Sequence, residues 1–281
     1  MDVRCAVKGV TFLEIGVGDV KTGTKKGIPI LGEMYKRAHQ LYPGGKTFTY
    51  VNSDCITTQK FVETADALVA TGKQFLGVGR RTNVPWRVDM EFGKFDFQQA
   101  FNRGELFASN AQDYFITSPN AWDWDKEVPE FVVGRIGYDN WLVDYAYHHP
   151  ATRLVDTTRT IPMIHQTGKR GNSEGHSSDQ ANKMHNHDLA NKKAGSRATK
   201  SWHDHGSTTH SQWVTDEDDS GTIVITKRTA RLNDGKRHTC GGTAKQGRYK
   251  GQSCQLAYNE QYKENKNADR WCESVSGCTL L

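Results

Sequence analysis

The sequence lacks the features that mark several classes of protein. It contains no run of about 18 apolar residues, the length that a membrane-spanning helix needs. Residues 1–20 carry acids at Asp2, Glu14 and Asp19 and have no continuous apolar stretch, so no signal peptide is expected. No internal repeat is visible, which excludes repeat architectures. We therefore expect no membrane span in this chain, and the compartment stays open: secretory or Golgi lumen with an upstream anchor, cytoplasmic otherwise.

Apolar residues are also scarce, at 36% of the 281, although aromatic residues make up 10%. The aromatics favour a folded body, and the low apolar share indicates that part of the chain is loosely packed. Four of the six cysteines lie in the last 42 residues, at Cys240, Cys254, Cys272 and Cys278. They form no Cys-x-x-Cys pair, so a structural zinc site is disfavoured there, and disulfides and free thiols both remain open.

The charge of the chain is unevenly placed. Residues 1–165 hold 19 basic and 19 acidic side chains, so the whole net charge of +5 falls in residues 166–281. A basic segment without a recognition motif is typical of a solvated tail, and no specific nucleic-acid partner is expected.

Hydrophobic periodicity alternates between the two-residue and the 3.6-residue pattern along the first two thirds of the chain. Such alternation with short connections predicts an α/β fold with a mostly parallel sheet covered by helices on both faces. Residues 88–110 are predicted to be irregular, and residues 227–281 are predicted to form a basic, cysteine-containing, poorly ordered tail. Strands are expected at 10–15, 47–52, 75–79, 113–117, 153–156, 160–165 and 222–226, and helices at 29–42, 58–71, 138–145 and 179–194.

A polar pair ends the second predicted strand. In the segment YVNSD (50–54), Asn52 and Asp54 follow a hydrophobic run and lie at its carboxyl end. Oxygen ligands there suit Mg²⁺ or Mn²⁺ bound through a diphosphate. The alternative is that Asp54 is a helix N-cap or a turn residue.

Two glycines flank Arg135 in the segment GRIGYDNW (134–141), which leads into an aromatic helix. Asp139 falls in the first turn of that helix, where the partial positive charge favours an ionised carboxylate that can act as a base. The alternative is that Asp139 caps the helix while Tyr138 and Trp141 pack in the core.

Histidines gather late in the chain. His165 ends the strand at 160–165, where a neutral imidazole could complete a metal site begun by Asp54. Nine of the eleven histidines lie between residues 148 and 210, including the pairs His185-x-His187 and His203-x-His205, with His176 and His210 nearby. Zn²⁺ or Ni²⁺ binding is plausible there, but no committed carboxylate or cysteine partner is evident.

The segment GVGRRT (77–82) ends a strand with glycines followed by Arg80 and Arg81. These arginines are suited to pair with phosphate or to order an acidic loop. A lone Gly-x-Gly lacks the third glycine of the dinucleotide fingerprint, so a Rossmann dehydrogenase is disfavoured.

Taken in order, these motifs resemble the nucleotide-diphospho-sugar transferase-like family, which has the GT-A glycosyltransferase fold. The segments that carry the resemblance span about residues 8–166, and more weakly reach 226: YVNSD (50–54), FLGVGRRT (75–82), DYF (113–115), VVGRIGYDNWLVDYA (132–146) and LVDTTRTIPMIHQ (154–166). The resemblance implies one domain over 1–226 that transfers a sugar from a nucleotide-sugar donor to a glycan or other hydroxyl acceptor, with Mn²⁺ or Mg²⁺.

The same resemblance assigns roles to individual residues. Asp54 and His165 are the implied metal ligands, with Asn52 in place of the first acid of a D-x-D motif, and Asp139 is the implied general base. Arg80, Arg81 and Arg135 are candidates to hold phosphate, so these three and Asn52 form the implied cofactor-binding set.

Two other functions stay open. Members of this family normally begin with another strand and helix, and we expect that this first unit is missing here. A non-catalytic carbohydrate- or partner-binding protein that keeps the GT-A-like fold is therefore the alternative. A third hypothesis is a histidine-rich metal or polyanion binder centred on residues 176–210 and the basic tail.

Overall fold

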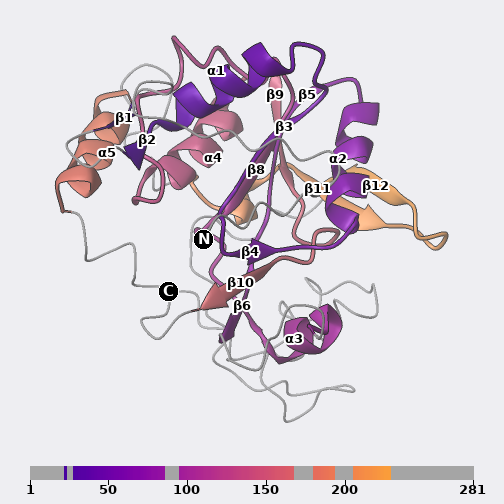
Figure 1. Ribbon diagram of the computed structural model, residues 1–281. Coiled ribbons are helices and arrows are strands. Elements are labelled where there is room, and N and C mark those ends of the chain that lie inside the picture. Colours follow the sequence, from indigo (N-terminus) through magenta and orange to yellow (C-terminus); the bar gives the residue numbers. More distant parts are fainter. Residues whose placement is uncertain (1–21, 24–27, 86–94, 168–179, 194–204, 229–281) are drawn as a thin grey trace.

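The structure is a computed structural model that describes residues 22–23, 28–85, 95–167, 180–193 and 205–228. The described residues form an α/β fold with two main sheets, a short two-stranded one and five α-helices (Figure 1). None of these helices has the length and apolar character that crossing a membrane requires.

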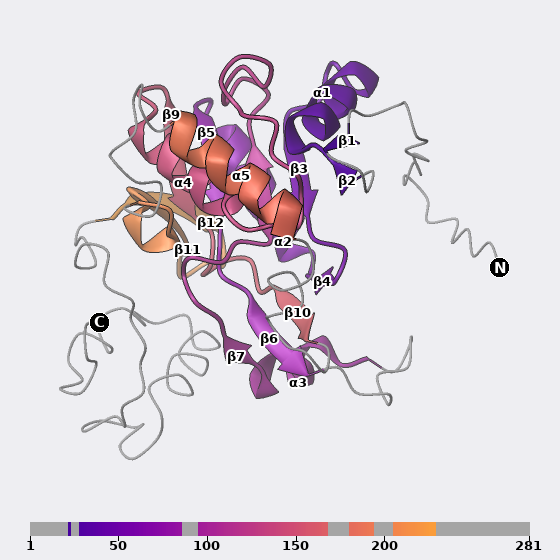
Figure 2. The same cartoon turned by 90° about the vertical axis from the view of Figure 1, so that its left-hand side faces the viewer.

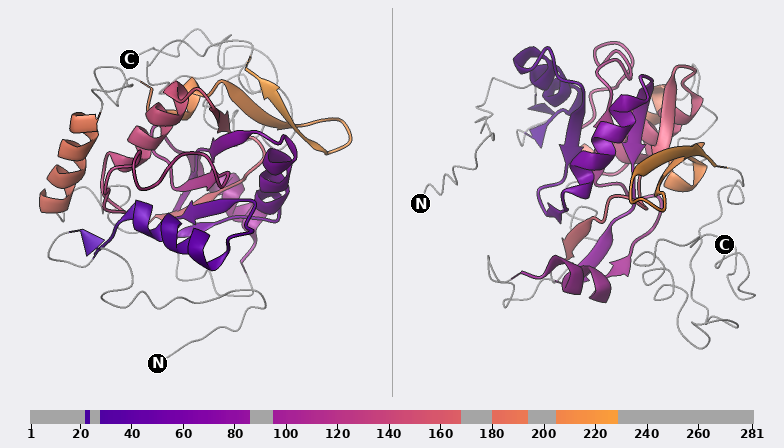
Figure 3. Two further views of the ribbon diagram at one scale, coloured as in Figure 1. Left: turned by 90° about the horizontal axis from the view of Figure 1, so that it is seen from above. Right: turned by 90° about the vertical axis from the view of Figure 1, so that its right-hand side faces the viewer.

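The larger sheet has six strands. In spatial order they are β12 (Ile223–Lys227), β11 (Trp213–Glu217), β9 (Thr152–Asp156), β5 (Gln74–Val78), β8 (Tyr114–Thr117) and β3 (Phe48–Val51). The β11–β12 hairpin forms one edge (Figure 3).

This sheet is mixed, and the expectation of a mostly parallel sheet is not confirmed. Only β11–β9 and β9–β5 are parallel neighbours. Strand β8 runs antiparallel between β3 and β5, and β12 is antiparallel because a tight turn, with Gly221 at φ +79°, returns the chain directly from β11. The four strands β3, β5, β9 and β11 nevertheless share one direction.

Helices cover both faces of the sheet, as predicted. On one face, α1 (Leu31–Leu41) packs against β3 and α4 (Tyr138–His148) against β5 and β9, in one cluster that includes Leu76 and Val78 of β5. On the other face, α2 (Lys60–Ala70) packs through Leu68 against Phe75 of the same strand. This division follows from the two-residue period of a strand, which sends alternate side chains to opposite faces. Figure 2 shows α5 (Gln180–Lys193) outside α4.

A second, four-stranded sheet lies beyond the end of β3, below the main sheet in Figure 1. In order it contains β4 (Cys55–Ile56), β10 (Ile164–Thr167), β6 (Thr82–Pro85) and β7 (Glu105–Leu106). Its β10 lies between β4 and β6, which brings three segments far apart in the sequence side by side.

Several expectations need correction or fall outside the described residues. Residues 88–110 are not wholly irregular, because α3 (Phe97–Arg103) begins where the Asp96 carboxylate accepts a hydrogen bond of 2.9 Å from the backbone N–H of Gln99. Strand β11 was not predicted. The remaining elements are β1 (Thr22–Gly23), β2 (Ile28–Pro29) and the 3-10 helix η2 (Thr208–His210). The strand at 10–15, His176, His203, every cysteine except Cys55, and tail residues 229–281 lie outside the described residues.

Candidate functional site at the end of strand β3

The site begins where the chain leaves β3 and crosses to the second sheet. Asp54 lies in the turn between β3 and β4, and His165 lies in β10, opposite Cys55 in the antiparallel register. The backbone N–H of Gln166 donates to the Asp54 carbonyl at 3.0 Å, which fixes the two segments against each other. As a result, His165 Nε2 lies 3.1 Å from Asp54 Oδ2.

The two side chains of this pair differ in exposure. The Asp54 side chain is 50% exposed, whereas His165 is buried. The hydrogen bond with His165 is the main cause that lowers the pKa of Asp54, and it outweighs the opposing effect of partial burial. On the other side of the ring, His165 Nδ1 is buried and finds no hydrogen-bond partner among the described residues. The pair therefore presents one carboxylate to solvent with an imidazole behind it.

Asn52 belongs to a second group that sequence reasoning did not foresee. Its Nδ2 donates to Asp113 Oδ1 at 2.6 Å, and its Oδ1 accepts from the Tyr50 hydroxyl at 2.8 Å. The other Asp113 oxygen accepts from the Arg81 guanidinium in a largely buried ion pair. The amide of Asn52 thus faces Asp113, and Asp54 carries the exposed carboxylate of the Asn-x-Asp motif.

Asp113 is the central residue that was missed. It immediately precedes β8, the antiparallel neighbour of β3, and its carbonyl accepts from the Asn52 N–H at 2.8 Å. The segment DYF (113–115) contributed only to the family resemblance, which gave no role to Asp113. Because the antiparallel neighbour could not be identified from sequence, the contact with Asn52 could not be derived.

Asp139 approaches the same group from the start of α4. Gly137 precedes the helix at φ +103°, a left-handed conformation that glycine adopts without strain, and this turn delivers Asp139 to the first helical turn. Its Oδ1 is buried and has no hydrogen-bond partner within the described part of the chain. Burial, reinforced by the nearby negative charge of Asp113, raises the pKa of Asp139 to about 6.

Two tyrosines join the strand and the helix. Tyr50 and Tyr138 meet edge to face with ring centroids 6.3 Å apart, and burial raises the pKa of Tyr50 to about 12. Both phenols therefore stay protonated at neutral pH and act as hydrogen-bond donors. Tyr138 thus joins the start of α4 to Tyr50, and Asp139, the next residue, is near enough to Asp113 to feel its charge.

The three predicted arginines lie in different surroundings. Arg81 is buried, with Nε donating to Asn83 Oδ1 at 3.1 Å and the guanidinium 4.5 Å from the centre of the Phe107 ring. Arg80 Nε donates to the Phe107 carbonyl at 2.7 Å, and one terminal nitrogen of Arg135 donates to the Gly134 carbonyl at 2.7 Å. Arg81 therefore orders the acidic group, and the phosphate role of all three arginines stays a prediction.

The separation of Asp54 and His165 suits a shared divalent ion. Two ligands about 2.1 Å from an octahedral ion lie about 3 Å apart along an edge, close to the observed 3.1 Å. An ion bound there would replace the hydrogen bond between the two side chains, with the ring proton of His165 on Nδ1. A mixed carboxylate and imidazole set favours Mn²⁺ over Mg²⁺, because imidazole is the softer ligand. With these two protein ligands from the described part of the chain, other positions are left for water and substrate phosphates, as is usual for such ions.

Comparison of the chain with protein-family models, with curated protein sequences and with solved structures finds no match. The site is therefore interpreted from its own geometry and from the motifs of the sequence.

Proposed function

We propose that this protein transfers a sugar from a nucleotide diphosphate to an acceptor hydroxyl with the help of Mn²⁺ or Mg²⁺. The observation that carries the proposal is the contact of Asp54 with His165, residues 111 positions apart in the sequence, at the carboxyl end of β3. Ligands of α/β sheets gather at this end of the strands. The ordered motifs that resemble the GT-A family include both residues.

In this proposal Asp54 and Asp139 have different roles. Asp54 and His165 hold the ion, which when bound offsets the negative charge that develops on the departing diphosphate. Asp139 accepts the proton of the acceptor hydroxyl as the acceptor oxygen bonds to the anomeric carbon. The bond from that carbon to the diphosphate oxygen breaks, and its electron pair leaves with the nucleotide.

The environment of Asp139 supports its role as the base. A carboxyl group with a pKa of about 6 is ionised at neutral pH and is a stronger base than an ordinary aspartate. Arg81 offsets the charge of Asp113 and holds that carboxylate in place, and Asp113 in turn fixes the orientation of Asn52.

Calorimetry with Mn²⁺ and a panel of nucleotide sugars tests the proposal. We expect Mn²⁺-dependent binding of a nucleotide sugar, which Asp54→Asn should weaken on the order of 100-fold while the exposed Asp66→Asn leaves it unchanged. Asp139→Asn should retain binding and lose turnover, by about 10²–10⁴-fold for a missing base. A folded protein that binds no nucleotide sugar contradicts the proposal.

One observation favours a non-catalytic alternative. Because the Asn52 amide is bonded to Tyr50 and Asp113, Asp54 is the single exposed oxygen ligand of the motif. We propose as second candidate a carbohydrate-binding protein with this fold. It predicts that glycan binding persists in chelator and that no donor is hydrolysed, whereas the transferase loses donor binding in chelator.

A further inference from the structure

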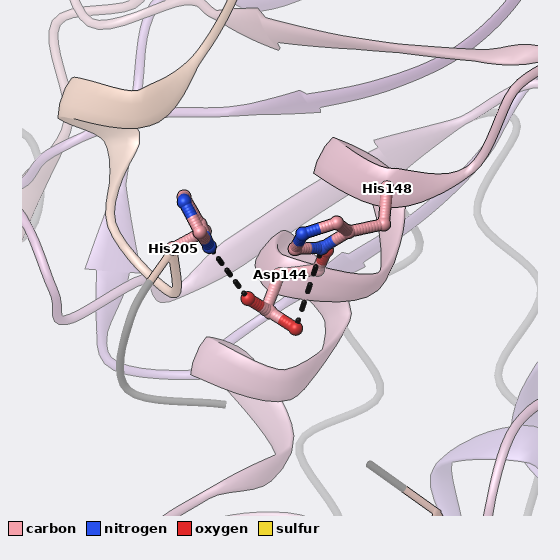
Figure 4. A group of neighbouring side chains, drawn as sticks. All are labelled: Asp144, His148 and His205. Carbon is pink, nitrogen blue, oxygen red and sulfur yellow. Dashed lines mark hydrogen bonds and ion pairs between the residues drawn. The ribbon is translucent and has the colours of Figure 1, made fainter. Parts of the chain in front are cut away.

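A second group of metal-binding side chains lies on helix α4, away from its first turn. Asp144 and His148 are four residues apart, so they project from the same face of the helix. His205 comes from the segment that precedes η2. Figure 4 shows the two imidazoles turned toward the carboxylate.

The distances within this group are short. His205 Nδ1 lies 3.4 Å from Asp144 Oδ1, and His148 Nδ1 lies 3.7 Å from Asp144 Oδ2. One potential ligand atom from each residue falls within 4.8 Å of the other two, and no other group of three such residues occurs in the described part of the chain. A small inward movement of the side chains would bring all three onto one ion.

The surroundings of each ligand match those of a built metal site. His148 Nδ1 lies 2.9 Å from the Asp144 backbone carbonyl, which holds the ring in place. With the ring proton on Nδ1, the Nε2 lone pair is left for a metal, so the 3.7 Å from Nδ1 to Asp144 Oδ2 locates the ring and not the ligand atom. Metal-binding histidines commonly donate their second nitrogen to a carbonyl in this way. The His205 ring is fixed by stacking on Tyr147, with centroids 4.3 Å apart and planes 7° from parallel.

Burial favours occupation by a cation. Asp144 is only 1% exposed, and a buried carboxylate carries a large desolvation cost that a divalent ion offsets.

The segment that carries His205 is held beside α4 by polar contacts. Asn140 Nδ2 donates to the Gly206 carbonyl at 2.7 Å, and the Thr208 N–H donates to the Ser109 carbonyl at 3.0 Å. These bonds position His205 without a metal, so an ion would meet a largely preformed site.

We propose that Asp144, His148 and His205 form a structural Zn²⁺ site that fastens residues 205–210 to helix α4. Two imidazoles and a carboxylate suit Zn²⁺. The fourth coordination position is left for water or for His210, whose ring centre lies 5.1 Å from that of His205. The site is distinct from Asp54 and His165 and does not depend on the proposed transferase function.

The test is the metal content of the full-length chain, made without a polyhistidine tag and dialysed against metal-free buffer. We expect one zinc per chain by mass spectrometry. His148→Gln and His205→Gln should each weaken Zn²⁺ affinity on the order of 100-fold, while His187→Gln on α5 and Asp54→Asn retain it. Co²⁺ added to the zinc-free protein should give the absorption bands of a tetrahedral ion in the wild type and in His187→Gln.

Thermal unfolding provides a second readout that separates loss of metal from loss of fold. Removal of zinc should lower the melting temperature of the wild type, and the variants that lack a ligand should already melt at that lower temperature and respond to neither chelator nor zinc. Absence of zinc from the folded wild type, iron in its place, or unchanged zinc in both ligand variants would overturn the proposal.

Discussion

Asp139 combines a cost to stability with a proposed chemical role. Its pKa is raised to about 6, so the folded protein binds this proton more tightly than the unfolded chain, where an aspartate has a pKa near 4. The stabilising contribution of the protonated carboxyl is complete below about pH 4 and is lost as the pH rises through about 6. At neutral pH the charged Asp139 therefore destabilises the fold.

Asp139→Asn should increase the free energy of unfolding at pH 7.5 by about 1–3 kcal/mol and change it little at pH 4. The cause is removal of a half-buried charge next to the charge of Asp113. Denaturant unfolding at the two pH values measures the effect, with Asp66→Asn as the exposed control. Equal stability changes at both pH values would show that burial does not raise this pKa.

A second prediction concerns the stability that the ion pair of Arg81 with Asp113 contributes. Its side chains are 10% and 5% exposed, so removal of one partner leaves a buried charge. Arg81→Met should lower the free energy of unfolding by about 3–5 kcal/mol. Lys126→Met, which breaks an exposed pair with Asp123, should change the free energy of unfolding little. Similar losses in the two variants would contradict the buried network.

At the scale of elements, the strongly periodic helices were predictable. The structure has helices at 31–41, 60–70 and 138–148, where apolar spacing predicted them, and at 180–193, where a helix was expected in a polar segment. Strand β11 was missed because the segment WVTDE carries two acids, and it forms a strand through its pairing with β9 and β12.

His185 and His187 lie in a helix, where residues two apart point in different directions. They therefore do not form the paired ligands that an extended chain would give.

The end of β5 depends on close packing at Gly79. A Cβ atom there would lie 2.0 Å from the Tyr114 hydroxyl and 3.0 Å from the backbone nitrogen of Thr158. The hydroxyl cannot move freely, because it is buried and hydrogen-bonded to Thr157 Oγ1 at 2.8 Å.

Gly79→Ala should therefore lower the free energy of unfolding by about 1–3 kcal/mol or more. Gly44→Ala is the matched control, since a Cβ atom there meets nothing within 4 Å. Thermal unfolding of both variants measures the difference. If Gly79→Ala is as stable as Gly44→Ala, the end of β5 is not packed against β8 in this way.

At the scale of the whole molecule, the class of fold was predictable and the direction of the strands was not. Alternating periodicity indicated α/β layers, but the antiparallel course of β8 between β3 and β5 depends on contacts between distant segments. The same limit applies to the site. Asp54, Asp139 and His165 were identified from the sequence as polar residues at the ends of elements. The contacts of Asp113 with Asn52 and of Asp144 with His205 form only in the folded chain, so these two acids were not identified.

The central claim is that Asp54 and His165 bind a divalent ion together. The most direct measurement is the electron paramagnetic resonance signal of free Mn²⁺, titrated with zinc-loaded protein in the presence of a nucleoside diphosphate. We expect the wild type and Asp66→Asn to remove the free-ion signal at one site per chain, and Asp54→Asn and His165→Gln to leave it. Equal Mn²⁺ binding by all four folded proteins would contradict it.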